Sequence, residues 1–459
     1  MATTDPITAS QAEAVAQMPS FAQACRVWWR IGLLSFGGPA GQIALLHGEV
    51  VDGRRWIGER RFLHALNFCT LLPGPEAQQL ATYLGWLMHG VKGGLAAGII
   101  FVLPGAAVML ALSLVYALAG RMPIIDALFF GLKSAVLVLV VEALLRIGRR
   151  ALQGAAGWGL AAAAFAALFV FGVPFPAVVL TAAAVGYRLP GSFSHGGHGQ
   201  AKQGRPALID AVLSIDPGRP ARFAASARKA GCIALAAWLL PVAALMAWAP
   251  GTYAEIAWFF SKMAVVTVGG AYAVLAYVAQ DAVQVQHWLA PEEMLAGLGL
   301  AETTPGPLIL VLQFVGFLAG FRAPGALSGV PGGIAASLLT LWVTFVPCFA
   351  FVFLGAPAIE RLQANVKLAG ALAAVTACVV GVIANLAVWF ALHVVFRDHV
   401  LRQLGPLAID MPVAASLDAG ALSLALVAAV CLFGLRLGVL RTLGITAAAG
   451  MGLRLAVGG

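Results

Sequence analysis

Charged residues are scarce in this chain of 459 residues. Asp, Glu, Lys and Arg make up 10% of it, whereas soluble domains contain about 25%. Hydrophobic residues make up 61%, and apolar runs of about 20 residues recur along the sequence. The alternation of polar and apolar residues that is typical of a membrane barrel is absent. The composition therefore excludes a soluble globular protein and predicts an all-α polytopic membrane protein.

The sequence also lacks the motifs of several enzyme classes. Its six cysteines are far apart and show no metal-ligand spacing, so we expect no metal and no cofactor. No Gly-Lys-Ser/Thr follows a Gly-rich turn and no His-Glu-x-x-His occurs, which excludes ATP hydrolysis by this chain and gives no sign of a metalloenzyme. The N-terminal residues show no signal-peptide pattern. The net charge of +9 is spread over inter-helix loops, which indicates positive-inside topology rather than nucleic-acid binding.

Apolar segments predict about 13 membrane spans in two halves. We expect a first repeat over 1–187, a disordered cytoplasmic linker over 188–228, rich in Gly, Pro, Ser and basic residues, and a second repeat over 229–459. The predicted spans are 26–46, 62–89, 94–119, 125–145, 155–172, 174–187, 229–250, 255–280, 294–321, 332–356, 367–396, 418–436 and 438–457. The distribution of cations makes the two halves inverted relative to each other. The arginine-rich loop 48–61 then faces outside, or 62–89 folds back as a re-entrant hairpin.

One stretch of the first half recurs in the second half at a constant shift of 232 residues, from 37 to 269. This shift preserves backbone breakers, an aromatic residue, a cation and an acid within apolar sequence, as expected for an internal repeat of a transporter. The matched residues are Arg30 and Lys262, Gly37-Gly38 and Gly269-Gly270, Glu49 and Asp281, Trp56 and Trp288, and Pro73-Gly74-Pro75 and Pro305-Gly306-Pro307.

The two Pro-Gly-Pro motifs predict broken helices at membrane depth, where such breaks are tolerated if they line a cavity. Proline suits the first position of a helix, so the N–H groups after Pro75 and Pro307 would point at the break and attract an anion. The candidate substrate-binding residues are Arg30, Gly37, Gly38, Gln42, Pro73, Gly74, Pro75, Glu76, Gln78, Lys262, Gly269, Gly270, Thr304, Pro305, Gly306 and Pro307.

Each of these candidates also has a purely structural interpretation. The Pro-Gly-Pro motifs could be simple kinks, and polar side chains near the breaks could join helices. Arg30 and Lys262 could extend to the lipid headgroups instead of attracting an anion. Glu76 and Glu302 flank the breaks and could cap a helix or take up protons in coupled transport.

The first half resembles the chromate ion transporter superfamily. The resemblance is carried by Phe36-Gly37-Gly38-Pro39, Trp56, Phe62, Pro73-Gly74-Pro75, Gln78, Ala81, Gly85 and Pro104. It covers nearly the whole chain, because long members of that family have two homologous domains. The second copy departs from the pattern, since Ala271 and Leu308 stand where the first half has Pro39 and Glu76.

The resemblance implies a secondary transporter in the inner (plasma) membrane that exports chromate and confers chromate resistance. Sulfate is a tetrahedral dianion of the same shape, so a sulfate importer is an alternative, and an uncoupled anion channel is another. The expected partners are chromate or sulfate and membrane lipid, with no nucleic acid. Proton coupling and a homodimer are left open by the sequence, and no enzymatic activity is expected.

Overall fold

The computed structural model describes residues 18–120, 122–152, 154–193, 207–216, 218–266, 271–324, 327–358, 365–404 and 407–457. Nearly all of the regular structure in these residues is helical. The helices of the first half are α2 (Phe21–Leu34), α3 (Gly38–His47), η1 (Gly48–Gly53), α4 (Glu59–Leu71), α5 (Glu76–Ala119), α6 (Pro123–Ala151), α7 (Ala155–Phe169), α8 (Phe175–Arg188) and α9 (Pro190–Phe193).

The second part of the chain is also mainly helical. Its elements are α10 (Leu208–Ile215), α11 (Arg219–Trp248), α12 (Thr252–Val266), α13 (Ala271–Gln280), η2 (Asp281–Val285), α14 (Pro291–Thr303), η3 (Leu308–Leu310), α15 (Val311–Arg322), α16 (Gly329–Gly355), η4 (Ala356–Ala358), α18 (Val366–Val395), β1 (His399–Leu404), β2 (Leu407–Pro412), η5 (Ala414–Ser416), α19 (Ala419–Ala429), η6 (Val430–Gly434) and α20 (Val439–Val457). The antiparallel β1–β2 hairpin was not predicted from the sequence.

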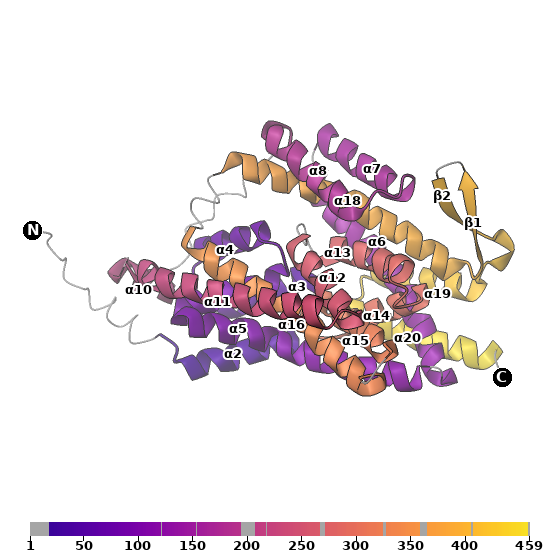
Figure 1. Cartoon of the computed structure of the whole chain (residues 1–459), viewed down its shortest axis with the longest axis horizontal. Coiled ribbons are helices and arrows are strands. Elements are labelled where there is room, and N and C mark those ends of the chain that lie inside the picture. Colours follow the sequence, from indigo (N-terminus) through magenta and orange to yellow (C-terminus); the bar gives the residue numbers. More distant parts are fainter. Residues whose placement is uncertain are drawn as a thin grey trace, which may run out of the picture.

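Five helices of the described residues are long and apolar enough to cross a membrane: α5, α6, α11 from Arg222 onward, α16 and α18. Together with many shorter apolar helices, they make the chain a multi-pass helical membrane protein. In Figure 1, α7 and α8 lie side by side along α18, and α16 crosses α5 near the centre of the molecule. Figure 1 also shows α10 and the β1–β2 hairpin at opposite ends of the molecule.

Helix α5 contains a reversal. His89 has a non-helical backbone and Gly90 a φ of 65°, so residues 76–88 and 91–119 form two segments. The segments pack closely at glycines: a Cβ added to Gly85 would lie 2.4 Å from the carbonyl oxygen of Gly93. Only the second segment, at 1.5 Å per residue about 43 Å long, can cross a bilayer whose hydrocarbon core is about 30 Å thick.

Several segments meet at one end of the molecule, which we call the α10 end (18–20, 54–61, 88–90, 207–216 and 218–223). The ring of His89 contacts the carbonyl oxygen of Pro19 with Nε2 at 2.9 Å, and Arg219 donates to the carbonyl of Met88 at 2.7 Å. A second set of segments, the Arg322 end (252–253, 286–293, 322–324 and 327–332), is also joined by hydrogen bonds. There Tyr253 donates to the carbonyl of Leu327 at 3.1 Å.

The predicted disordered linker is partly ordered. Within it, α10 buries Ile209 completely, and its N-terminus binds the loop 54–61. The backbone N–H of Leu208 donates to the carbonyl of Arg55 at 3.0 Å, and Arg61 pairs with Asp210 at 2.7 Å. The prediction of disorder was therefore wrong for α10, because its apolar side chains have a surface to pack against. It was also wrong for α9 and for residues 219–228, which belong to α11.

Candidate functional site

The predicted span 26–46 is broken at residues 35–38, which we call the FGG tip. Arg30 on α2 pairs with Glu49 beyond the end of α3, with Nε and Oε1 3.3 Å apart. In one continuous helix these residues would lie about 28 Å apart. The chain therefore reverses at the FGG tip, and α2 and α3 form a hairpin rather than a single membrane-crossing rod.

The Pro-Gly-Pro motifs also lie at reversals, the first PGP tip (72–75) and the second PGP tip (304–307). Across the first tip, the rings of Phe68 and Tyr83 have centroids 5.4 Å apart. Across the second tip, a Cβ added to Gly297 would lie 2.5 Å from a ring carbon of Phe314. Residues 62–89 thus form a hairpin, as the re-entrant alternative requires, and α14 and α15 form an equivalent hairpin.

The fourth pair, α12 and α13, folds back as well. The rings of Phe259 and Tyr277 have centroids 5.9 Å apart. The predicted site residues Gly269 and Gly270 come between these two helices in the sequence and lie outside the described residues.

Both PGP tips have the same local geometry. Gly74 has φ of 122° and Gly306 φ of 97°, a region that disfavours any residue with a Cβ. Just before each motif, a backbone N–H donates to the carbonyl three residues earlier. The N–H of Leu72 donates to Cys69 at 3.1 Å, and that of Thr304 to Ala301 at 3.3 Å. The glycine of each motif is thus required by the backbone conformation of the reversal.

The 232-residue shift also relates a turn away from the tips. The N–H of Trp56 donates to the carbonyl of Val50 at 2.8 Å, and that of Trp288 to the carbonyl of Ala282 at 2.9 Å. These bonds close the turns that follow η1 and η2. The same local structure therefore occurs twice, in hydrogen bonds as well as in sequence.

The second PGP tip docks on the FGG tip of the other half. The N–H of Gly306 donates to the carbonyl of Ser35 at 2.7 Å. The side chain of Gln42 donates from Nε2 to the carbonyl of Gly306 at 2.5 Å, and Gln42 is almost completely buried. Residues 304–307 are all buried. Two predicted site segments, 264 residues apart, are thus joined through backbone polar groups.

Each PGP tip also rests on a long helix of the opposite half. Gly105 on α5 lies so close to the second tip that an added Cβ would be 2.0 Å from the carbonyl oxygen of Pro305. At the first tip, a Cβ on Gly74 would lie 2.9 Å from Sγ of Cys348 on α16. Gly105 and Cys348 follow the matched prolines Pro104 and Pro347, so the contact is reciprocal.

Several buried side-chain oxygens near the tips have no hydrogen-bond partner among the described residues. They are Oγ of Ser35 and Oε1 of Gln78, Gln79 and Gln313. The amide nitrogens of all three glutamines are bonded. Gln78 donates to the hydroxyl of Thr82 at 3.3 Å, Gln79 to the carbonyl of Pro73 at 2.6 Å, and Gln313 to that of Ala106 at 3.0 Å. Buried polar atoms are normally paired with protein or water, so this region is suited to a polar ligand or water.

The matched cations do not lie at the tips. Arg30 is exposed and its partner Glu49 is at the far end of the hairpin. Lys262 is placed over the ring of Phe259, with Nζ 5.8 Å from the centroid, and its charge acts on Asp281. The matched cations and acids thus interact with each other in both halves, and a role of the cations in substrate binding stays a prediction.

The acids beside the tips differ between the halves. Helix α5 begins at Glu76, with Pro75 as its N-cap and no side chain capping its first turn. In the second half, Pro307 is the N-cap of the short helix η3, so both prolines precede the first helical position by one residue. Glu302 is buried and accepts a hydrogen bond of 2.7 Å from the hydroxyl of Tyr272.

Four residues at the tips were not predicted from the sequence. They are Ser35, Gly105, Tyr272 and Cys348. The match of Pro104 with Pro347 pointed to Gly105 and Cys348, because each is the next residue in the chain. The other two have no signal in the sequence beyond lying close to a break. Gln79 was expected as a polar group near the break that could bind an oxyanion, although it was not among the candidate substrate-binding residues.

Both halves of the chain match one known protein family. The sequence profile of the Chromate transporter family matches residues 22–187 and 254–453. A chromate transport protein of Pseudomonas aeruginosa is 33% identical over 387 residues, covering 82% of each chain. A chromate transport protein of Cupriavidus metallidurans is 26% identical over 359 residues, covering 77% of this chain and 78% of its own. No solved structure matches.

The two matched regions lie in the two halves that carry the repeated tips. The relatives are transport proteins, which confirms the prediction that the chain is not an enzyme. The family suggested by the motifs around the FGG and first PGP tips is confirmed as well. The chain belongs to the Chromate transporter family.

Proposed function

We propose that this protein exports chromate across the inner membrane as a secondary transporter and so confers chromate resistance. Relatives are named chromate transport proteins, which gives the substrate. The observation that carries the mechanism is the docking of the second PGP tip on the FGG tip through Gly306, Ser35 and Gln42. It joins half-length helices of both repeats at one buried point, where transporters bind their substrates.

The halves are inverted in this proposal. Both hairpins of the first half start and end at the α10 end. There Pro19 contacts His89, the carbonyl of Arg55 accepts a hydrogen bond from the N-terminus of α10, and the carbonyl of Met88 accepts one from Arg219 of α11. Both hairpins of the second half return to the Arg322 end, where Arg322 donates to the carbonyl of Trp288 at 2.9 Å and pairs with Glu293. The crossing helices α5 and α16 run from one end to the other.

The lengths of the hairpins fit this arrangement. Helices α2 and α14 have 14 and 13 residues, or about 20 Å each at 1.5 Å per residue. Two such helices that enter from opposite faces and touch at their tips span about 40 Å, which matches a bilayer with its headgroup regions. The protein then crosses the membrane fewer times than the predicted 13, because four predicted spans are hairpins.

The α10 end faces the cytoplasm in this proposal. It carries the arginines of the loop 54–61 as well as the basic residues of α11, and such an excess is typical of the inner side. The docking of α10 on this loop removes the difficulty of an arginine-rich loop on the outside.

The tips supply the positive potential for a dianion. The N–H groups of the first turn of α5 follow Pro75, which offers no capping side chain, and a helix N-terminus attracts anions. Gln78 and Gln79 add buried polar groups. In this proposal Glu76 or Glu302 couples protons to transport, and rocking of one half against the other exposes the tips to each side in turn.

Chromate flux in proteoliposomes tests the proposal. We expect wild-type protein to move labelled chromate out of the α10 side, with a rate that changes when the membrane potential or the proton gradient is imposed, collapsed or reversed. Movement of sulfate inward in preference to chromate outward would favour a sulfate importer. Currents that follow the anion gradient alone would favour an anion channel. No flux of either anion would refute transport of tetrahedral dianions.

A further inference from the structure

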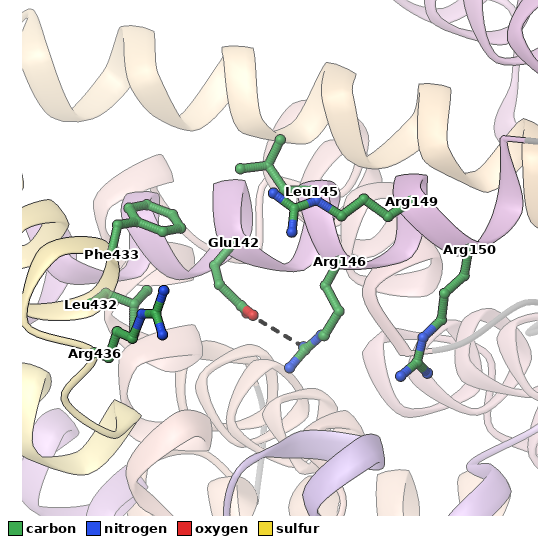
Figure 2. Close-up of a pocket in the computed structure, with 8 residues that line it drawn as sticks. All are labelled: Glu142, Leu145, Arg146, Arg149, Arg150, Leu432, Phe433 and Arg436. Atoms are coloured by element: carbon green, nitrogen blue, oxygen red, sulfur yellow. Dashed lines mark ion pairs between the residues drawn. The ribbon is translucent and has the colours of Figure 1, made fainter.

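A basic pocket away from the tips is the strongest feature that the proposed function leaves unexplained. It has a volume of about 530 Å³ and lies between the C-terminal part of α6 and the turn after η6. Figure 2 shows Arg146 and Glu142 facing each other from α6, with Leu432, Phe433 and Arg436 arriving from the other segment. We call it the arginine pocket (Glu142, Leu145, Arg146, Arg149, Arg150, Leu432, Phe433 and Arg436).

The arginine pocket has an excess of positive charge. Four of its eight residues are arginines and one is an acid. Glu142 pairs with Arg146, with 3.5 Å between the charged atoms, and both side chains are about one-third exposed. Positive-inside topology explains arginines at the end of α6. It does not explain why Arg436, from a segment far along the chain, is brought to the same place.

The fold holds Arg436 in position. Its φ is 52°, a conformation that is unusual for a residue other than glycine. Two hydrogen bonds close the turn on either side of Arg436. The N–H of Leu435 donates to the carbonyl of Val430 at 2.8 Å, and the N–H of Leu437 donates to the carbonyl of Cys431 at 2.9 Å. The following helix α20 packs tightly on α6. The pocket is thus built by rigid elements on both sides.

The arginine pocket lies on a helix that also packs against the proposed transport site. Helix α14, which ends at the second PGP tip, packs along α6, where Gly299 faces Leu132. The charges of Arg146 and Glu142 are felt at the buried carboxyl of Glu302, two residues before the second PGP tip. An anion held in the pocket would therefore bind on the helix that supports the hairpin of this tip.

We propose that the arginine pocket binds a tetrahedral oxyanion before it reaches the tips. Guanidinium groups suit this ligand because they offer paired N–H donors and a permanent charge. The same chemistry is offered by a free oxyanion such as sulfate or chromate and by the phosphate of an anionic lipid headgroup. The role as a capture site rests on the proposed function, whereas binding of the oxyanion itself does not.

Binding of labelled sulfate to protein in nanodiscs of neutral lipid tests the pocket. The test variant is Arg149→Gln with Arg436→Gln, and the matched control is Arg228→Gln, an exposed arginine on α11 at the α10 end. We expect the double variant to bind about half as much sulfate per chain, and wild-type binding to weaken with salt because exposed charges are screened beyond about 8 Å at physiological ionic strength. Thermal unfolding shows whether the variants are folded.

A second arm separates the two sources of the oxyanion. Phospholipids that co-purify with each variant are counted by mass spectrometry after expression in a membrane containing phosphatidylglycerol. Loss of sulfate binding with unchanged lipid assigns the pocket to a free oxyanion, and loss of bound lipid assigns it to a headgroup. The proposal is overturned if folded double variant matches Arg228→Gln in both arms.

Transport kinetics distinguish failure of the pocket from failure of the proposed function. For capture of a free oxyanion, the double variant should raise the KM for chromate about tenfold and leave kcat nearly unchanged, because rim charges act mainly on association. An unchanged KM together with unchanged sulfate binding refutes the pocket and leaves transport intact. Wild-type protein that binds sulfate at the pocket but moves no chromate refutes the proposed function instead.

Discussion

The contact between Gly105 and the second PGP tip gives the sharpest prediction. In Gly105→Ala, the new Cβ would lie 2.0 Å from the carbonyl oxygen of Pro305 and 2.6 Å from Cδ1 of Leu310. A carbon and a carbonyl oxygen need about 3.3 Å, so the tip has to move by about 1.3 Å. The clashing oxygen belongs to the backbone, and no side-chain rotation can relieve it.

The expected cost follows from what such a movement breaks. A shift of this size would lengthen the 2.7 Å bond from Gly306 to Ser35 beyond hydrogen-bond range. Overpacking costs about 1–3 kcal/mol and each lost hydrogen bond about 1 kcal/mol. Alanine returns about 1 kcal/mol through its higher helix propensity. The state with docked tips should therefore lose about 1–3 kcal/mol.

Chromate flux and thermal unfolding measure the effect on function and on folding. Because about 1.4 kcal/mol changes a population tenfold, we expect Gly105→Ala to reduce flux by about fivefold to a hundredfold. Gly159→Ala is the control for helix propensity, since no atom lies within 4 Å of its Cβ position. Gly186→Ala is the control for crowding, because its Cβ would lie 2.3 Å from the carbonyl oxygen of Gly370, between α8 and α18.

Two results would refute this reasoning. If folded Gly105→Ala protein transports chromate like Gly159→Ala, docking of the tips does not matter for transport. If Gly186→Ala loses as much flux at the same thermal stability, the loss comes from general crowding of helices and not from displacement of the tip.

Three further changes test other contacts. Gln42→Leu removes the bond to the carbonyl of Gly306, at about 1–3 kcal/mol for a buried group left unpaired, and should speed hydrogen exchange in the second PGP tip. Gly74→Ala places alanine at φ of 122°, a strain of about 1–3 kcal/mol, and should lower the Tm. Arg322→Gln should cost about 0.5–1 kcal/mol, because the pair with Glu293 is partly exposed. Burial alone would raise the pKa of Glu293, but the hydrogen bonds from Arg322 and the N–H of Ala290 hold it below its usual value. The stabilisation is therefore present at neutral pH and lost as the pH falls through that pKa, so chemical unfolding of wild type and Arg322→Gln should converge in acid.

The breaks could be predicted from the sequence because they depend on local backbone chemistry. Proline and glycine within apolar sequence indicate a break in a helix. Two such motifs related by one constant shift in the sequence indicate it more strongly. The conformation at Gly74 and Gly306 follows directly, since both need positive φ. The family likewise followed from motifs that surround these glycines.

The direction of the chain after each break could not be predicted. A break allows a straight continuation or a reversal, and the choice depends on contacts such as the pair of Arg30 with Glu49. The repeat in the sequence matched Arg30 with Lys262 and Glu49 with Asp281. It gave no sign that Arg30 and Glu49 contact each other. Residues 26–46 were therefore predicted as one membrane-crossing helix, and the predicted number of spans rested on the same interpretation.

The order in α10 was missed for a related reason. Its apolar residues are few and flanked by polar sequence, so composition favours disorder. They are ordered because Ile209 finds a buried position against the loop after η1. A short helix of this kind is stabilised by tertiary packing and not by its own propensity.

In the proposed transporter one dianion binds between two copies of a repeat, and the two tips differ in charge. Glu76 begins the helix after the first PGP tip, where Leu308 stands in the other half. An ionised Glu76 and a bound anion would compete for the same helix N-terminus. The second tip has no acid at that place, and its Glu302 is held by Tyr272. Duplication thus explains the shared architecture of the tips. In the proposed mechanism, the divergence of Glu76 from Leu308 means that an arriving anion meets a carboxyl at the start of the helix after the first tip and an apolar side chain after the second.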